Sequence, residues 1–248
     1  MINIDAIRSG LDNGEFFLEY LPTVSLEDGR CLGAETLIRW RRPSGVLLPD
    51  SFIPMVENTP LSGLMTYWVI DTVALELSDW LQANEDIHLS LNVPPEILGR
   101  GGLEYAAVKS GLAAFKDKLI LEVTERGIPD KLGLDAINSM NSSGVRIALD
   151  DVSGGGANLA LLCRAGIDII KLAKVFMDEM LQENWSPDTL SGITMLVKTT
   201  NIEVIAEGVE TASQVNILKK AGVKMAQGWY FSRPLPADDF TAFFYDRR

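Results

Sequence analysis

The chain has 248 residues, of which 47% are hydrophobic and 23% charged, and its formal net charge is -12 at pH 7. This composition is ordinary for a globular protein with a sizeable core, and the acidic balance disfavours non-specific binding to DNA, RNA or an anionic membrane. No apolar run reaches transmembrane length and Met1 opens no signal peptide, so we expect a cytoplasmic protein without membrane insertion.

The first third of the chain is predicted to form a helix, a β-hairpin and two more helices. Ile4, Ile7 and Leu11 recur at helical spacing, and Glu27-Asp28-Gly29 is typical of a hairpin turn between two strand-like runs. The predicted elements are a helix at 2–13, strands at 16–25 and 31–40, and helices at 49–58 and 61–83.

From residue 88 onward, predicted strands and helices alternate. The strands are 88–93, 119–123, 145–149, 167–172, 202–206 and 223–227, with helices between them and a closing helix at 238–244. Such alternation implies βαβ units and a parallel sheet. Together with the hairpin, it predicts one domain over residues 1–248, an α/β fold of the modified TIM (β/α)8 barrel type with one antiparallel strand.

The stretch 145–159 contains the clearest single signal. Its buried strand runs into Asp150 and Asp151, and three glycines, Gly154 to Gly156, follow. Paired acids before a glycine-rich loop indicate a metal or phosphate site, but a solvated strand end followed by a turn explains one isolated instance equally well.

Polar side chains also close the other predicted strands. In a barrel of this type, the C-terminal strand ends meet at one mouth, where the chemistry of such folds takes place. Taken alone, an acid after a strand is often an exposed loop residue, and Asn92 could cap a turn. Glu35, among apolar neighbours, is the hardest to explain as surface. The strand-end residues are Glu35, Asn92, Glu122, Glu125, Asp150, Asp151, Lys171, Glu207 and Gln227.

This set of side chains favours a hard metal ion. So many carboxylates share one cavity only if cations offset their repulsion. His88 is the only histidine, and the two cysteines, Cys31 and Cys163, read as separate free thiols, so oxygen ligands for Mg²⁺ or Mn²⁺ remain. A pair of such ions is the usual apparatus for phosphodiester hydrolysis. Lys171 would stay protonated and polarise the water or phosphate, or balance charge.

Eight ordered segments of the chain resemble one known family, the EAL domain, a bacterial cyclic di-GMP phosphodiesterase module. The resemblance runs from about residue 16 to residue 236. The segments are ETLIRW from Glu35, FIP from Phe52, LNV from Leu91, LEVTE from Leu121, ALDD from Ala148, DIIK from Asp168, EGVE from Glu207 and QGW from Gln227.

The resemblance implies hydrolysis of cyclic di-GMP to linear pGpG on a modified TIM barrel, with two ions, Mg²⁺ or Mn²⁺. It further implies a homodimer, with sensory or GGDEF domains in a longer parent chain. The implied metal ligands are Glu35, Asn92, Glu122, Asp150, Asp151 and Glu207. The implied catalytic residues are Glu35, Lys171, Asp151 and Gln227, the substrate contacts are Arg39, Leu37, Asp168 and Glu210, and the loop anchor is Glu125.

The chain also departs from the family pattern. Leu21 replaces a glutamine, Ala173 replaces an aspartate, and Thr36 replaces the alanine of the signature. The loop usually written DFGTGYSSL is DVSGGGANL at 151–159, where Val152 removes an aromatic anchor and the glycines add backbone entropy. These departures keep other hypotheses open: a weak or inactive module that binds cyclic di-GMP or a protein partner as a sensor, or a scaffold that binds no nucleotide.

Overall fold

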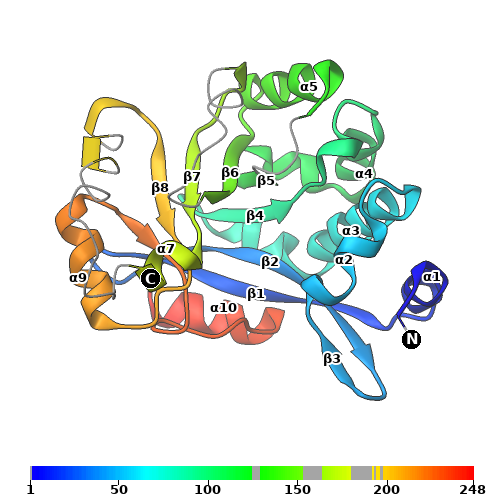
Figure 1. Cartoon of the computed structure of the whole chain (residues 1–248), viewed down its shortest axis with the longest axis horizontal. Coiled ribbons are helices and arrows are strands. Elements are labelled where there is room, and N and C mark those ends of the chain that lie inside the picture. Colours follow the sequence, from blue (N-terminus) through cyan, green and yellow to red (C-terminus); the bar gives the residue numbers. More distant parts are fainter. Residues whose placement is uncertain (1, 125–128, 153–163, 180–191, 193, 196–197) are drawn as a thin grey trace.

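The computed structural model describes residues 2–124, 129–152, 164–179, 192, 194–195 and 198–248. Glu125, the loop segment 153–163 and most of the helix predicted at 159–165 lie outside the described residues. The described residues form a sheet that closes on itself, with helices around it (Figure 1).

Eight strands form a closed barrel, and a ninth extends one of them. Around the barrel the order is β1-β9-β8-β7-β6-β5-β4-β2, closed by the β1–β2 pairing, and β3 is added to β2. The hairpin strand β1 is antiparallel to both of its neighbours, β2 and β9, as predicted. The strands are β1 (Phe16–Ser25), β2 (Cys31–Arg42), β3 (Gly45–Leu47), β4 (His88–Asn92), β5 (Leu119–Thr124), β6 (Arg146–Val152), β7 (Ile169–Leu172), β8 (Glu203–Ala206) and β9 (Met225–Ala226).

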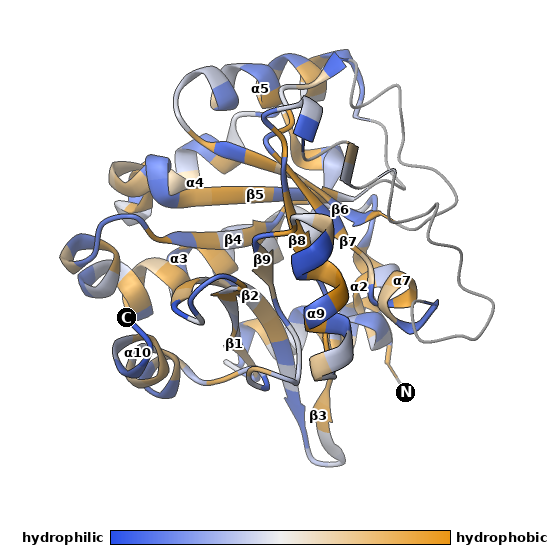
Figure 2. Cartoon of the chain, turned by 90° about the vertical axis from the view of Figure 1, so that its left-hand side faces the viewer, coloured by the Kyte–Doolittle hydropathy of each residue, from blue (hydrophilic) through white to orange (hydrophobic). Residues whose placement is uncertain are grey.

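The helices cover the outside of this barrel, and in Figure 2 most of them combine hydrophobic and hydrophilic residues while the strands are mainly hydrophobic. No helix in the described part of the chain is long and apolar enough to cross a bilayer. The α-helices are α1 (Ile4–Asp12), α2 (Ile53–Val56), α3 (Pro60–Ala83), α4 (Gly102–Ser110), α5 (Lys131–Ser142), α7 (Lys174–Glu179), α9 (Ala212–Ala221) and α10 (Ala237–Asp246). Short 3₁₀ helices are η1 (Pro49–Ser51), η2 (Pro95–Ile97) and η3 (Leu112–Lys118).

Local sequence explains where α9 begins and ends. The Thr211 side chain accepts a hydrogen bond from the Gln214 backbone N–H, and the Gln214 side chain accepts one from the Thr211 backbone N–H. This reciprocal pair satisfies amide groups that the first helical turn leaves free. At the other end, Gly222 adopts a left-handed conformation with φ 85°, which a glycine reaches without steric cost.

Strand alternation builds the interior of the barrel in layers. Five apolar residues from neighbouring strands, which we call the apolar layer, form a separate buried cluster. Because side chains alternate along a strand, the residue two positions later points to the same side and lies one layer closer to the C-terminal end. The apolar layer consists of Ile120, Ala148, Ile169, Ile205 and Met225, and the residues two positions on are Glu122, Asp150, Lys171, Glu207 and Gln227.

The structure also contains features that the sequence pattern did not predict. The three-residue strand β3 pairs with the end of β2, beyond the barrel itself. Strand β6 continues to Val152, and its pairing with β7 is irregular between Leu149 and Val152. The last strand, β9, has only two residues, and α10 then packs on the hairpin, where the Phe240 ring lies 5.8 Å from that of Tyr20.

Candidate active site at the C-terminal ends of the barrel strands

Lys171, from β7, lies at the centre of a buried acidic cluster. Its side chain is 1% exposed, and carboxylates from β2, β5, β6 and the position directly after β8 surround its ammonium group. No two of these strands are joined by a tight turn, so the cluster depends on closure of the barrel. The Lys171 Nζ lies 2.7 Å from Glu207 Oε1, 2.8 Å from Glu122 Oε2, 3.1 Å from Glu35 Oε2 and 3.2 Å from Asp150 Oδ1.

Two amide side chains connect the acids to each other. The Gln227 Nε2 donates hydrogen bonds to Glu35 Oε2 and, at 3.0 Å, to Glu207 Oε1. The Asn92 Nδ2 donates to the other oxygen of Glu35 at 3.3 Å. The buried Thr23 hydroxyl donates to the Gln227 Oε1 at 3.3 Å, which fixes the direction of that amide.

Asp151 interrupts the regular alternation of β6. In a regular strand, adjacent residues point to opposite faces, so Asp150 and Asp151 would not act on one site. Here Asp151 has a left-handed φ of 61°, at the irregularity in the β6–β7 pairing. Its charge acts on Asp150, where it contributes to raising the pKa. Non-glycine residues in this conformation are strained and cluster at functional sites.

The positive charge of Lys171 does not offset the four buried acids around it, and the pKa values of three of these acids are therefore raised. Burial would lower the pKa of Lys171, but the surrounding carboxylates raise it well above its usual value. Burial and the charge of Glu35 raise the pKa of Glu122 well above its ordinary range. Burial likewise raises the pKa of Asp150, and that of Glu207 to about 8. Burial would also raise the pKa of Glu35, but Lys171 lowers it.

The donor chemistry of this cluster fits divalent metal ions. Within the described part of the chain, both carboxylate oxygens of Glu122 and Oδ1 of Asp150 are buried without a hydrogen-bond partner, and the charge of Lys171 compensates them. Oxygen ligands of this kind suit Mg²⁺ or Mn²⁺. No group of three or more acidic, histidine or cysteine side chains among the described residues is arranged to hold an ion. In this arrangement the ammonium group itself occupies the point where the carboxylates converge.

The residues expected to contact substrate occupy different places. Arg39 and Leu37 lie beyond Glu35 on β2, on the same face by alternation, and Arg39 is buried in an ion pair with Glu19. Glu210 follows Glu207 by three residues and pairs with Lys174, just after β7. Glu125 lies outside the described residues.

The structure places Asp168 apart from the cluster around Lys171. Asp168 comes immediately before β7, at the opposite end of that strand from Lys171. Its Oδ2 accepts hydrogen bonds from Asn141 Nδ2 at 2.6 Å and from the Ile147 backbone at 2.8 Å. Asp168 therefore links the beginnings of β6 and β7 and does not belong to the cluster around Lys171.

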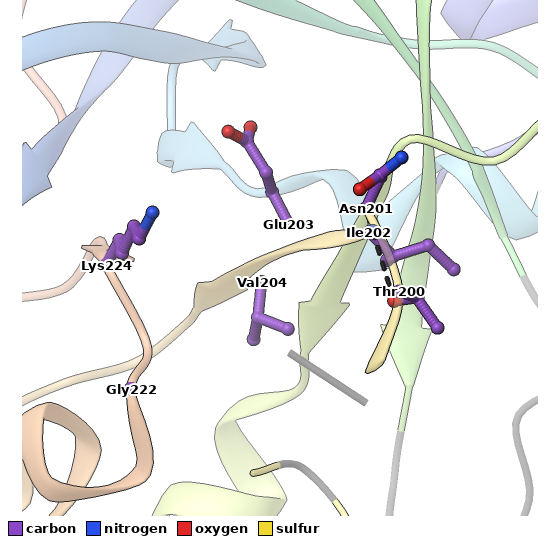
Figure 3. Close-up of a pocket in the computed structure, with 7 residues that line it drawn as sticks. All are labelled: Thr200, Asn201, Ile202, Glu203, Val204, Gly222 and Lys224. Atoms are coloured by element: carbon purple, nitrogen blue, oxygen red, sulfur yellow. Dashed lines mark hydrogen bonds between the residues drawn. The ribbon is translucent and has the colours of Figure 1, made fainter. Parts of the chain in front are cut away.

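The other end of the barrel contains separate polar groups. Arg146 of β6 pairs with Glu203 of β8, and His88, at the start of β4, is buried with no partner for its Nε2 among the described residues. A cavity of about 240 Å³ lies here, lined by residues 200–204 with Gly222 and Lys224. Figure 3 shows Asn201 and Glu203 on one side of β8 and Val204 on the other. None of the predicted site residues lines this cavity.

Two polar residues near the site were missed by the sequence analysis. Thr23 contacts Gln227, and Glu19 contacts Arg39. Both lie on β1, in regular alternation with Leu21, which pairs with Glu35 across the hairpin. The signal was present in the predicted hairpin, because a register that sets residue 21 against residue 35 brings 19 and 23 to the same face.

Comparison with known proteins is consistent with this site. Over 238 residues the chain is 32% identical to the probable cyclic di-GMP phosphodiesterase PdeB of Escherichia coli, covering 94% of this chain and 45% of that protein. The EAL enzyme Bd1971 in its cAMP-bound form superposes with a TM-score of 0.85 at 30% identity, over 97% of this chain and 69% of that one. The MucR phosphodiesterase in complex with c-di-GMP superposes with a TM-score of 0.83 at 28% identity, over 96% and 98%.

The chain thus spans less than half of the length of PdeB, and it matches nearly the whole of the MucR phosphodiesterase structure. The family model of the EAL domain matches residues 4–234, which include every strand of the barrel. With the acidic cluster at the C-terminal strand ends and the closed barrel with one antiparallel strand, these matches identify the protein: the chain belongs to the EAL domain family.

Proposed function

We propose that the chain is a metal-dependent phosphodiesterase that hydrolyses cyclic di-GMP to linear pGpG. One observation carries the proposal: a buried lysine lies within 3.2 Å of four carboxylates at the ends of four other strands, and two amides are hydrogen-bonded to two of these acids. A purely structural cluster gains little from this arrangement, because buried charges are costly and hydrophobic replacements are often as stable.

Metal binding would resolve the excess of negative charge. We assign Glu35, Asn92, Glu122, Asp150, Asp151 and Glu207 as ligands of two ions, Mg²⁺ or Mn²⁺. When bound, such ions lower the pKa of a water molecule and stabilise charge on the attacking and leaving oxygens. Their arrival would also release Lys171 from its role as the compensating cation of the cluster.

Lys171 and Gln227 would then act on the reacting atoms. The surrounding carboxylates raise the pKa of Lys171 well above its usual value in the metal-free protein, and the ammonium group would donate hydrogen bonds to the attacking water or to a phosphate oxygen. The amide of Gln227, oriented by Thr23, helps to orient the same water. Arg39, Leu37 and Glu210 would contact the substrate, with Arg39 at a phosphate. Asp168 has no part in this scheme.

A sensor without turnover is the second candidate, and one contact favours it. Leu21 stands directly opposite Glu35 in the hairpin, so an apolar side chain faces the site where the family has a glutamine. A domain of this kind would bind cyclic di-GMP or signal to a protein partner. A homodimer, and sensory or GGDEF domains in a longer parent chain, are proposed for either case from the family resemblance.

A product assay distinguishes the two candidates. The chain is incubated with cyclic di-GMP and Mn²⁺ or Mg²⁺, and pGpG is separated by chromatography; in parallel, calorimetry with Ca²⁺ measures binding alone. A phosphodiesterase forms pGpG with Mn²⁺ or Mg²⁺, and Glu35→Ala removes both activity and metal binding. Binding without product would support the sensor. Neither binding nor product would contradict both.

A further inference from the structure

Arg39 on β2 is buried and forms an ion pair with Glu19 on β1. The register pairs Leu21 with Glu35, Glu19 with Leu37 and Phe17 with Arg39. We call this face of β1 and β2, which includes Glu35, the mouth face. Trp40 and Ile38 alternate to the opposite face and pack in the cluster with α1 and α2. Glu19 and Arg39 are therefore diagonal neighbours on the mouth face.

Among the residues that the structure describes, the contacts of Arg39 leave part of its guanidinium unused. Its Nε donates to Glu19 Oε2 at 2.7 Å, and its Nη1 donates to the Ile38 carbonyl oxygen at 3.1 Å. A guanidinium has five N–H groups, so three remain, all on the two terminal nitrogens. Two parallel N–H groups on this outer edge are the geometry that binds a phosphate in a bidentate manner.

Arg39 is more deeply buried than Glu19, as expected if Glu19 positions Arg39. The Arg39 side chain is 7% exposed and that of Glu19 is 26% exposed. The arginine is thus held below the surface by an acid that stays partly hydrated. A long side chain with many rotamers binds more tightly when it is ordered before the ligand arrives, because less conformational entropy is lost on binding.

We propose that Glu19 is a positioning residue for Arg39, which it orders on the mouth face with its outer N–H groups free for a phosphate of the substrate. This inference rests on the proposed function, because it takes Arg39 as the residue that binds that phosphate. Glu19 itself does not touch the reacting atoms.

The negative charge of Glu19 would also repel an anionic substrate bound nearby, which would weaken binding. The charge is partly exposed and already neutralised by Arg39, so its repulsion of the substrate is screened. The ordering of one flexible, charged side chain corresponds to roughly a fivefold change in affinity. Ordering therefore outweighs repulsion, and loss of Glu19 weakens binding.

The test compares Glu19→Ala with Glu19→Gln, since glutamine keeps an oxygen acceptor for the Arg39 Nε but carries no charge. We expect Glu19→Ala to raise KM for cyclic di-GMP about fivefold with kcat nearly unchanged, and Glu19→Gln to restore KM to within about twofold of wild type. The same order is expected for the dissociation constant measured by calorimetry with Ca²⁺. In an Arg39→Ala background, Glu19→Ala should have no further effect.

Glu15→Ala is a matched control in the same hairpin. Glu15 Oε2 pairs with Arg42 Nη1 at 2.9 Å, and its side chain is 31% exposed, but Arg42 alternates to the face opposite Arg39. This control should leave KM unchanged, and the melting temperature of each variant reports on folding.

Three results would overturn the role of Glu19 alone, provided that the wild type binds cyclic di-GMP. They are an unchanged or lower KM in Glu19→Ala, a failure of glutamine to restore KM, and an effect that persists without Arg39. A wild-type chain that neither binds nor hydrolyses cyclic di-GMP would instead overturn the proposed function, and this inference with it.

Discussion

Two adjacent layers inside the barrel differ in nearly every property, although the same strands build both. The apolar layer of Ile120, Ala148, Ile169, Ile205 and Met225 is buried and packed. Two residues further along each strand, the side chains are charged or polar and crowd around Lys171. The lower layer follows the usual rule for a protein interior, and the upper layer breaks it.

This difference separates what holds the barrel together from what it does. Each large apolar side chain in the lower layer contributes about 2 kcal/mol by leaving water. Each buried acid in the upper layer instead loses hydration, which a single ammonium group does not restore for four carboxylates. The upper layer is therefore a source of instability in the metal-free protein and the place where ligand binding adds the most stability.

Replacing the central cation should have the largest effect of any single change. Lys171→Met keeps a long apolar stem but removes the donor and the positive charge. We expect kcat for cyclic di-GMP hydrolysis to fall by about 10³-fold or more, within the range for loss of a group that acts on the transition state. Steady-state product assays at saturating Mn²⁺ measure this. Lys220→Met, an exposed change on α9, is the control, and equal loss in both variants would contradict a role for Lys171.

A substitution that leaves a cavity in the apolar layer should lower stability and leave kcat almost unchanged. Ile169 precedes Lys171 by two residues and is fully buried. We expect Ile169→Ala to lower the free energy of unfolding by about 2–4 kcal/mol, since it removes buried methyl groups and leaves a cavity. Urea denaturation of the metal-free protein measures this loss, while kcat of the folded variant should stay within about twofold of wild type. A large drop in kcat with unchanged stability would show that the layers are not separable.

The pH dependence of stability should differ between the two ends of the barrel. Glu207 has its pKa raised to about 8 in the folded protein, so the native state holds extra protons and the metal-free protein loses stability as pH rises from about 4.5 to 8. Burial lowers the pKa of His88 to about 3, so below about 6.5 the unfolded state binds more protons and stability falls with acid.

Each proton contributes a slope of roughly 1.4 kcal/mol per pH unit, so these two contributions cancel between about pH 4.5 and 6.5, and stability should fall on either side of that range. Urea titrations over pH 3 to 9 measure both limbs. Saturating Mg²⁺ should flatten the alkaline limb, and His88→Gln should flatten the acidic one. An alkaline limb that does not respond to divalent ions would argue against metal binding at these acids.

Neutralising one acid should produce the smallest effect. Glu122→Gln keeps the shape of the side chain and replaces a carboxyl group, whose pKa burial raises well above its ordinary range, with a group that cannot ionise. We expect the metal-free protein to gain about 1 kcal/mol at neutral pH, because it no longer has to keep a buried acid protonated above the pKa of that acid in the unfolded state. Thermal melts with and without Mg²⁺ measure this, and the stabilisation by Mg²⁺ should shrink in the variant. A destabilised metal-free variant would mean that Lys171 alone balances the cluster.

Strand alternation explains why much of the barrel and its site could be predicted from the sequence. Polar residues at the strand ends stand out against apolar runs, and parallel strands bring their ends together, which correctly grouped Glu122, Asp150, Lys171 and Glu207. Asp168 was named from the motif match alone and lies before its strand; a motif match carries no information about which end of the strand a residue occupies.

Other features depend on contacts that local patterns do not encode. The left-handed Asp151 arises from the irregular pairing of β6 with β7, and residue types alone do not reveal such a bulge. Strand β3 has only three residues, too few for a periodic pattern. The ion pair between Glu19 and Arg39 can be predicted only when the register of the hairpin is known.

The antiparallel strand β1 also has a consequence for how the chain folds. It closes the barrel by pairing with β9, and Thr23 reaches Gln227 across 204 residues of sequence. Contacts this distant in sequence are slow to form, because a long loop must close before they stabilise anything. A chain emerging from the ribosome therefore has an open edge on β1 until β9 and α10 have been synthesised. The candidate site is completed in the same event, since Gln227 directly follows the strand that closes the barrel.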